Sequence, residues 1–339
     1  MRTVSQPLCP NCGADGVEAY SELRDKLYGA PGTWRMQRCR NARCGVYWGD
    51  PAPHPDDLPL AYCNYYTHAY DPEGRRPSDL YVAVRKAYMA RRLGYRNGEA
   101  WLPRQLSRLV PLLPERSQSA LYARFYLPWK RDGRLLEVGC GSGKQLEAMA
   151  QAGWIVRGVD FDPQAVAVAH SRGLDVALGD VRTLELPGAS FDAIVMAHVL
   201  EHVFDPVGLL TECARLLKPG GKLVSITPNA DSLGHRIFRR AWRGLEPPRH
   251  LVIYTPDGLR LACARAGLAV ERVDVTARDA ANLLLASARI RKSAHNAQIR
   301  RPQAGMRPPF PLRVLAGIER LGNLAGLAWG EELVLMACK

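Results

Sequence analysis

The sequence lacks a hydrophobic run long enough to cross a membrane. No stretch approaches the roughly 18 apolar residues that a transmembrane helix needs, and the N-terminus, MRTVSQPLCP, has no apolar signal-peptide core. These absences predict a cytoplasmic protein without a membrane span. In such a reducing compartment, the nine cysteines are not expected to form a disulfide framework.

Lysine is also scarce, because only eight of the 46 basic residues are lysine. The formal net charge is nevertheless +13, and such a surplus suggests nucleic acid as a partner. The arginines, however, are spread along the chain in short clusters and form no concentrated stripe. This distribution favours a small-molecule partner, with nucleic acid as the alternative.

The composition divides the 339 residues into three parts. Residues 1–50 form a cysteine-containing module, residues 51–133 a linker and helical cap region, and residues 134–339 a regular domain with a tail insertion at about 279–328. The proline-rich stretch PAPHPDDLP, at 51–59, opens the linker, and we expect no helix there.

From Arg134 onward, strand-like runs alternate with helical runs. The helical runs are Lys144–Ala152, Pro163–Arg172, Pro206–Leu217 and Pro256–Ala266. Three of them follow an N-cap residue, namely Asp162, Asp205 and Thr255, and open with proline. Two further strands are expected in the tail. The alternation predicts an α/β fold with a doubly wound, mostly parallel, seven-stranded sheet.

Four cysteines stand in two pairs, Cys9-x2-Cys12 and Cys39-x4-Cys44, with spacings typical of a tetrahedral zinc site. Four thiolates indicate a closed structural site, whose metal would supply folding energy to a small module. The alternative is a set of scattered buried thiols. The remaining cysteines stand singly in apolar contexts and are predicted to pack in the core: Cys63, Cys140, Cys213, Cys263 and Cys338.

The most informative motif is LLEVGCGSG, which covers Leu135–Gly143. It predicts a buried strand that ends in a glycine-rich turn, where backbone can approach a ligand closely. Asp160 ends the next apolar run, at the place where nucleotide-binding α/β folds bind a ribose diol. Lys144 replaces the last glycine of a dinucleotide fingerprint, which disfavours a pyrophosphate-containing cofactor.

This turn resembles the S-adenosylmethionine (SAM) turn of class I methyltransferases. The resemblance extends through GVDFDP, FDAIVMAHVLEHVFDP, LLKPGGKLVSITPN and PPRHLVIYTPDGLRLACARAGL, and it covers about residues 134–275 plus the terminal strand. The subgroup it resembles is the ubiquinone-pathway O-methyltransferase type. The N-terminal part, from CPNCG to YYTHAY, is similar to a subset of these enzymes with a zinc-ribbon-like module.

The resemblance implies SAM as the cofactor. The expected cofactor-binding residues are Glu137, Gly139, Cys140, Gly141, Gly143, Asp160, Phe161, Asp180, Val181, Ala197 and His198. Of these, Asp160 would accept hydrogen bonds from the ribose hydroxyls, Phe161 would pack beside the adenine, and Asp180 would accept from the adenine amino group. Ala197 and His198 would line the sulfonium end.

Two histidines are candidates for the catalytic base, because a pKa near neutrality suits proton transfer. His250 lies in LEPPRHLVIY, and His202 lies beside Glu201 in AHVLEHVFDP. The alternative for His202 is a structural one, in which it holds the start of the following helix.

Together these features predict SAM-dependent methyl transfer to a small-molecule acceptor, such as a saccharide or secondary-metabolite intermediate, most simply by O-methylation. One alternative is an rRNA or tRNA methyltransferase, since some of those carry zinc ribbons. Another is a non-catalytic interaction protein built on a zinc module. The sequence does not name the acceptor, its methylated atom or the oligomeric state.

Overall fold

The computed structural model describes residues 1–62, 78–95, 100–293 and 307–339. Its main sheet has seven strands in the order β12–β13–β10–β9–β6–β7–β8. They are β6 (Arg134–Val138), β7 (Ile155–Asp160), β8 (Val176–Leu178), β9 (Phe191–Ala197), β10 (Leu217–Pro228), β12 (Ala269–Thr276) and β13 (Glu332–Cys338). Strand β6 pairs in parallel with β7 and β9, and β7 with β8, whereas β12 and β13 are antiparallel. The predicted fold class is confirmed.

Helices alternate with these strands, as the sequence predicts. They are α4 (Lys144–Ala150), α5 (Pro163–Ser171), α6 (Pro206–Leu216) and α8 (Pro256–Arg265). All three predicted caps are present: the Asp162 carboxylate accepts from the Gln164 amide, Asp205 from that of Gly208, and the Thr255 hydroxyl from that of Gly258. These caps fix the residue at which each of the three helices begins.

The chain forms two compact units. The first, which we call the cysteine unit, comprises Met1–Tyr65, Ala197–Ala214 and Ser225–Lys339. The second, the glycine-turn unit, comprises Tyr66–Met196 and Arg215–Val224.

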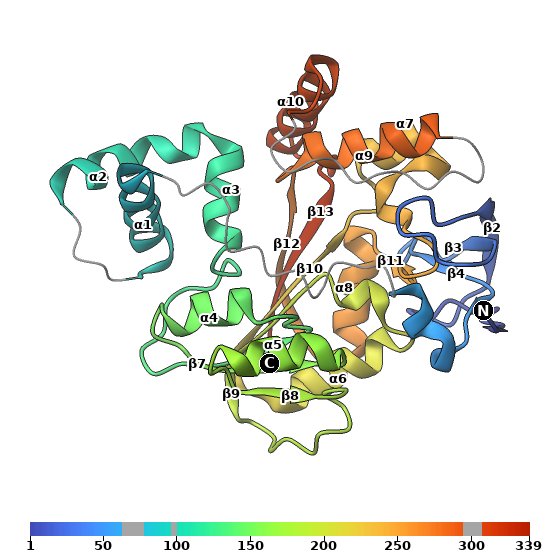
Figure 1. The fold of residues 1–339 in the computed structure, drawn as a ribbon, viewed down its shortest axis with the longest axis horizontal. Coiled ribbons are helices and arrows are strands. Elements are labelled where there is room, and N and C mark those ends of the chain that lie inside the picture. The colour runs from blue at the N-terminus through green and yellow to red at the C-terminus, as the bar shows by residue number, and fades with distance from the viewer. Residues whose placement is uncertain (63–77, 96–99, 294–306) are drawn as a thin grey trace. The chain divides into compact units, whose positions relative to one another are not determined.

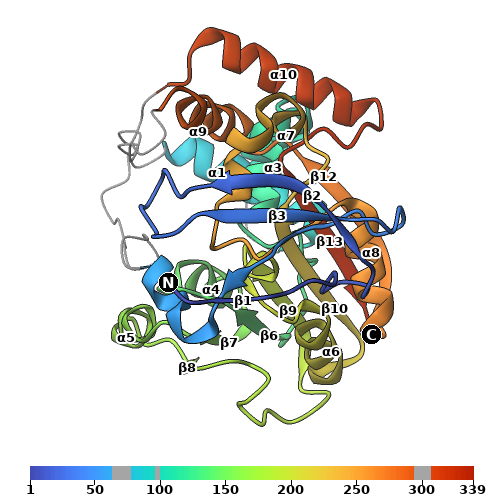
Figure 2. The same cartoon turned by 90° about the vertical axis from the view of Figure 1, so that its right-hand side faces the viewer.

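The cysteine unit contains a second sheet of four strands, in the order β11–β4–β3–β2. They are β2 (Gly16–Leu23), β3 (Trp34–Cys39), β4 (Tyr47–Gly49) and β11 (Val252–Ile253). Figure 2 shows β2 and β3 running side by side. Val252 pairs antiparallel with Trp48, so a strand from the α/β part of the chain completes the sheet of the cysteine module. A two-stranded sheet of β1 (Thr3–Val4) and β5 (Ala52–Pro53) lies in the same unit.

Helices α7 (Leu233–Phe238), α9 (Ala280–Lys292) and α10 (Phe310–Leu324) also belong to the cysteine unit (Figure 1). Here α9 lies against both α7 and α10. They cover a buried apolar cluster that includes Trp34, Phe238, Trp242 and Leu284. The predicted tail insertion therefore contains two helices, and residues 294–306 between them lie outside the described ranges.

The linker departs from the sequence prediction of no helix at 51–59. A short 3₁₀ helix, η1 (Pro55–Ala61), forms there. Its first residue is proline, which needs no backbone donor at that position, and the His54 side chain accepts from the Asp56 amide. Cys63, predicted to pack in the core, lies outside the described residues.

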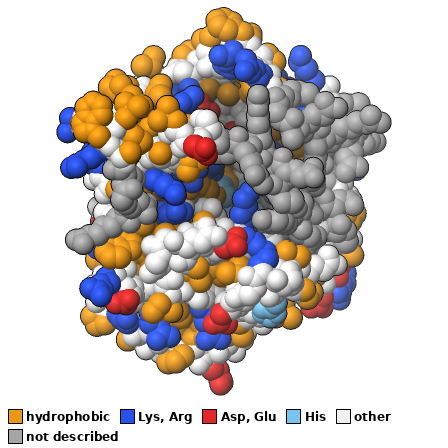
Figure 3. Space-filling model, turned by 60° about the vertical axis from the view of Figure 1, so that its left-hand side comes forward, with side chains coloured by type: hydrophobic (Ala, Val, Ile, Leu, Met, Phe, Trp, Pro, Cys, Tyr) orange, Lys and Arg blue, Asp and Glu red, His pale blue; other side chains and the backbone are white. Residues whose placement is uncertain are grey.

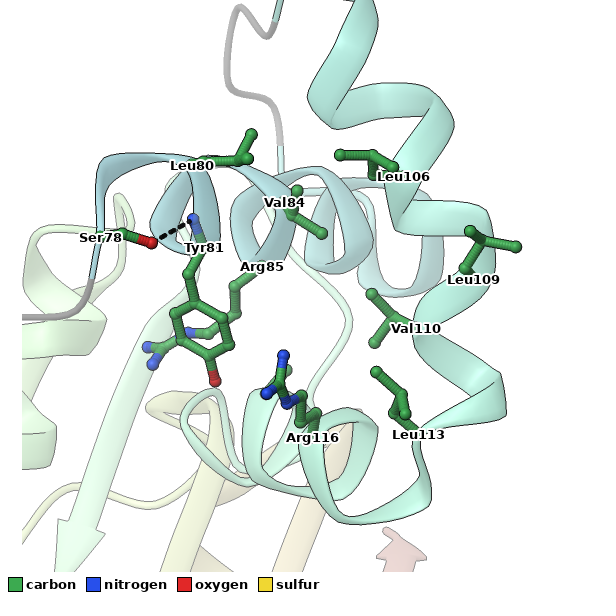
Figure 4. Close-up of a pocket in the computed structure, with 11 residues that line it drawn as sticks. Ser78, Leu80, Tyr81, Val84, Arg85, Leu106, Leu109, Val110, Leu113 and Arg116 are labelled. Atoms are coloured by element: carbon green, nitrogen blue, oxygen red, sulfur yellow. Dashed lines mark hydrogen bonds between the residues drawn. The ribbon is translucent and has the colours of Figure 1, made fainter.

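The glycine-turn unit begins with helices α1 (Asp79–Leu93), α2 (Trp101–Leu106) and α3 (Pro114–Tyr122). Helix α3 ends at Tyr122, and the positive φ values of Phe125 and Tyr126, 49° and 56°, prevent the helix from resuming there. A groove of about 370 Å³ lies between these helices, lined by leucines such as Leu80, Leu109 and Leu113 (Figure 4).

Basic residues also line this groove, and Figure 4 shows Arg85 and Arg116 beside the Tyr81 ring. Figure 3, in which the side of Figure 1 that bears α1 to α3 comes forward, shows apolar and basic side chains next to one another. Across the described ranges, none of the helices combines the length and the apolar character that a membrane span requires.

Candidate functional site

The glycine-rich turn follows β6 and has the backbone geometry that its sequence predicts. Gly139, Gly141 and Gly143 have φ of 69°, 52° and 76°, values that residues with a Cβ rarely adopt. A Cβ on Gly143 would lie 2.4 Å from Leu174 Cδ1. The Gly139 amide donates to the Val159 carbonyl at 2.8 Å and so ties the turn to β7.

Asp160 holds the same turn from the end of β7. Its Oδ2 accepts from the Gly141 amide at 2.7 Å, and its Oδ1 accepts from the Asp162 amide at 2.9 Å. The residue is only 7% exposed, and burial raises the pKa of its carboxyl group. Each oxygen keeps a further lone pair that could accept from a ribose hydroxyl.

Glu137, in β6, is a second buried acid in this unit. It is 4% exposed, and burial together with the Asp160 charge raises its pKa well above the ordinary value. Its Oε2 has no hydrogen-bond partner among the described residues. Two buried carboxyl groups fit a cationic ligand, because a positive charge would offset their repulsion. SAM carries a sulfonium and an ammonium group, so the residues present fit this cofactor.

The other expected cofactor residues of this unit differ in how exposed they are and in their contacts. The Phe161 side chain is exposed, whereas Val181 and Cys140 are buried. Burial raises the pKa of the Cys140 thiol. Asp180 forms an ion pair with Arg182, whose Nε lies 3.0 Å from its Oδ1, and this pair would have to share the carboxylate with an adenine amino group.

In the cysteine unit, His198 directly follows Ala197, the last residue of β9. Its Nδ1 lies 3.1 Å from Glu201 Oε1, and its Nε2 lies 3.2 Å from Glu332 Oε1. Burial opposes the charged form, but hydrogen bonds to both carboxylates raise the pKa of His198 well above the ordinary value. His198 is thus held as a cation and cannot accept a proton at neutral pH. Glu332 lies far along the chain from His198, and no pattern near His198 indicates this contact.

His202 and His250 lie together, with ring centroids 4.8 Å apart. The Nδ1 of His202 lies 2.9 Å from the Arg249 carbonyl, and the Nδ1 of His250 lies 2.6 Å from that of Gly244. A carbonyl only accepts, so each Nδ1 carries the proton and each Nε2 keeps its lone pair. Burial lowers the pKa of both, most strongly for His250.

Exposure separates the two candidates. His250 is 6% exposed, whereas His202 is partly exposed. Glu201, His202 and His250 also each offer a ligand atom within 4.8 Å of the others, so they could hold a divalent cation. The cluster can therefore accept a proton or bind a metal, and His202 has the better access to a ligand.

The predicted cysteine ligands converge in the N-terminal part of the cysteine unit. Their four Sγ atoms lie within 4.8 Å of one another, with 3.8 Å between Cys9 and Cys44 and 3.4 Å between Cys12 and Cys39. A zinc ion about 2.3 Å from four sulfurs requires S–S separations of about 3.8 Å. A hydrogen bond with Cys9 lowers the pKa of Cys44 to about 5 and favours a thiolate there. The donor set fits zinc.

The cysteine cluster is bonded to the segment that carries His250. The Thr255 hydroxyl donates to the Cys44 carbonyl at 2.7 Å, and the Gly49 amide donates to that of Leu251 at 3.1 Å. The Leu251 amide in turn donates to the Glu201 carbonyl at 2.7 Å. These hydrogen bonds tie the segment that carries His250 both to the Cys44 backbone and to Glu201.

Comparison with known proteins adds a family match. The family described as "Methyltransferase domain" matches residues 100–273, more than half of the chain. Solved SAM-dependent methyltransferases from Archaeoglobus fulgidus and Mesorhizobium loti are similar to this chain, with TM-scores of 0.44 and 0.43 and identities of 20% and 19%. These alignments cover 74% and 65% of this chain, and 99% and 97% of those chains.

Curated relatives match over a shorter region. The ubiquinone biosynthesis O-methyltransferase of Xanthomonas oryzae pv. oryzae is 44% identical over 103 residues, which are 28% of this chain and 43% of that protein. A probable SAM-dependent methyltransferase of Mycolicibacterium smegmatis is 36% identical over 136 residues, 38% of this chain and 52% of that protein. The chain thus spans about half the length of the curated relatives it matches.

Proposed function

Because the chain belongs to the class I SAM-dependent methyltransferase family, we propose that it transfers a methyl group to an oxygen atom of a small-molecule acceptor. When bound, SAM supplies an electrophilic methyl group on a sulfonium. The observation that carries the proposal is the pair of buried carboxyl groups, Glu137 and Asp160, beside the glycine-rich turn. This arrangement supports binding of a cationic nucleoside rather than a dinucleotide.

We assign His202 as the group that removes the acceptor proton. Its Nδ1–H is fixed on the Arg249 carbonyl, which leaves Nε2 as the base, and its lowered pKa keeps it neutral at physiological pH. His250 packs against its ring and orients it. The curated relatives named as ubiquinone biosynthesis O-methyltransferases support oxygen as the accepting atom and a small molecule as the acceptor.

The proposal is tested by following labelled methyl groups. The protein is incubated with methyl-labelled SAM and a cell extract separated into small-molecule and RNA fractions. We expect label in the small-molecule fraction, and an Asp160→Ala protein as the control should transfer far less. Label that enters only the RNA fraction would replace the proposal with the RNA methyltransferase alternative. SAM binding without any transfer would favour the non-catalytic alternative.

We further propose that the four cysteines hold one structural zinc ion. Protein purified without chelators should contain about one zinc per chain by metal analysis. Cys12→Ser removes one ligand and should lower both the zinc content and the melting temperature, because metal binding is coupled to folding. Cys338→Ser, which changes a cysteine outside the cluster, is the matched control and should retain zinc. Zinc-free wild-type protein would contradict the proposal.

A further inference from the structure

A pocket of about 260 Å³ in the cysteine unit has no role in the methyl transfer proposed above. Three segments line it: residues 22–27 at the end of β2, residues 240–247, and the end of α9 at residues 290–291. Its apolar walls include Leu23, Leu27, Trp242 and Ile290. Its basic lining residues are Arg24, Lys26, Arg240, Arg243 and Arg291.

Two of the three acidic lining residues are neutralised from within the protein. Asp25 and Glu246 are 9% and 3% exposed. Arg249, itself fully buried, donates from Nη1 to Asp25 Oδ2 at 2.8 Å and from Nε to Glu246 Oε1 at 2.9 Å. Arg243 also pairs with Glu246. The potential inside the pocket is therefore set mainly by the other basic residues, with Glu22 the remaining exposed acid.

Three of those basic residues are not neutralised by an acidic side chain of the described part of the chain. Within the described ranges, no ion pair involves Arg24, Arg240 or Arg291. Arg240 Nη2 donates to the Ser21 carbonyl at 2.9 Å, and the Arg291 guanidinium lies 4.8 Å from the centre of the Phe238 ring. These contacts position two of the cations and leave their charges available to a ligand.

Lys26 offsets the feature that would most repel an anion, namely the carbonyl groups at the C-terminal end of α9. Its Nζ donates to the carbonyls of Ile290 and Ser293 at 3.3 and 3.1 Å, and so offsets the negative end of the α9 dipole. Burial, and to a smaller extent the Arg240 charge, lower the pKa of Lys26. A bound anion near Lys26 and Arg240 would favour their charged forms.

The pocket walls are part of a rigid core. Leu23, Trp242 and Leu245 belong to the buried apolar cluster that also includes Phe238. The Trp242 indole is fixed further, because its Nε1 donates to Glu331 Oε2 at 2.7 Å. The cavity is thus preformed, which lowers the entropic cost of binding a ligand.

We propose that this pocket binds a phosphate or diphosphate ester of a small organic molecule. The planar forks of Arg24, Arg240 and Arg291 suit phosphate oxygens, which guanidinium groups bind in bidentate fashion. The apolar walls suit the organic part of the ester, whereas inorganic phosphate would leave them uncovered. The proposal goes beyond methyl transfer and does not depend on it, because its test measures binding alone.

Calorimetry on the full chain at low salt tests the proposal, with uridine diphosphate and pyrophosphate as probes. We expect uridine diphosphate to bind more tightly than pyrophosphate. The double variant Arg24→Ala/Arg291→Ala should weaken uridine diphosphate binding by about 10-fold or more, since it removes two charged hydrogen-bond donors. Arg260→Ala, an exposed arginine of α8 that does not line the pocket, is the matched control and should leave binding unchanged.

Several results would overturn the proposal. Undetectable binding of both probes, or equal binding by wild type and the double variant, removes the site. Displacement of uridine diphosphate by SAM assigns the probe to the cofactor site instead. Equal affinity for the two probes would show that the pocket recognises an inorganic anion and gains nothing from the organic part of an ester. If the double variant no longer binds SAM, the milder Arg24→Gln, at an exposed side chain, carries the same test.

Discussion

Replacing His202 with alanine is expected to lower turnover by about 10²–10⁴-fold, the usual contribution of a positioned general base. The neutral imidazole has its Nδ1 proton committed to the Arg249 carbonyl, which leaves Nε2 as the accepting atom, and the alanine variant removes that base. SAM affinity should not change, because the buried carboxyl groups of the glycine turn are untouched. Turnover with a methyl acceptor and calorimetry with SAM measure the two effects separately.

His250→Ala tests the competing assignment. If His250→Ala abolishes turnover while His202→Ala keeps it, His250 is the base, and full activity of both variants removes histidine base catalysis. The pH profile gives an independent readout. Because burial lowers the pKa of His202, the acid limb of turnover should lie below pH 6.5, the ordinary value for histidine, with activity retained above it. The residual turnover of His202→Ala should not show this fall at low pH.

Asp160→Ala should weaken binding of SAM and of its demethylated product by about 10–150-fold, which corresponds to losing hydrogen bonds worth roughly 1.5–3 kcal/mol at a charged acceptor. The variant removes the acceptor for ribose hydroxyls. It also removes the partner of the Gly141 and Asp162 amides, so the turn itself loosens. Calorimetry with both ligands measures the loss.

Asp175→Ala is the comparison for Asp160→Ala, because Asp175 lies in the same unit, has a 68% exposed side chain and makes a long ion pair with Arg157. It should bind SAM like the wild type. NAD should not bind to any of these proteins, since Lys144 replaces the last glycine of a dinucleotide fingerprint. If Asp160→Ala binds SAM unchanged, the cofactor site has been placed wrongly.

The parts of the fold that could be predicted depend on local chemistry. An aspartate or threonine followed by proline specifies a helix start through its own side chain, so the caps at Asp162 and Thr255 could be read without any tertiary information. The glycine turn is similar, because its positive φ values require residues without a Cβ. The four cysteines that cluster in the structure are likewise indicated by their spacing alone.

The parts that could not be predicted depend on contacts between distant segments. Nothing near His198 indicates that Glu332 will hold its Nε2, and that contact determines whether the imidazole is charged. The choice between His250 and His202 as the base likewise depends on how exposed each side chain is. The sequence pattern around each histidine does not show this. The short strand β11 has no signal of its own, since it exists only through pairing with β4.

The pairing of β11 with β4 has a consequence for engineering this protein. A chain shortened to begin after β4 would leave the backbone donors and acceptors of Val252 and Ile253 exposed as an open edge, which promotes aggregation. The Gly258 position adds a steric condition, because a Cβ there would meet Val46 and the Cys44 carbonyl at 2.4 and 2.6 Å. The N-terminal part is therefore not an interchangeable attachment. A chimera that grafts it from a relative should stay soluble only when residues 252–258 come from the same parent.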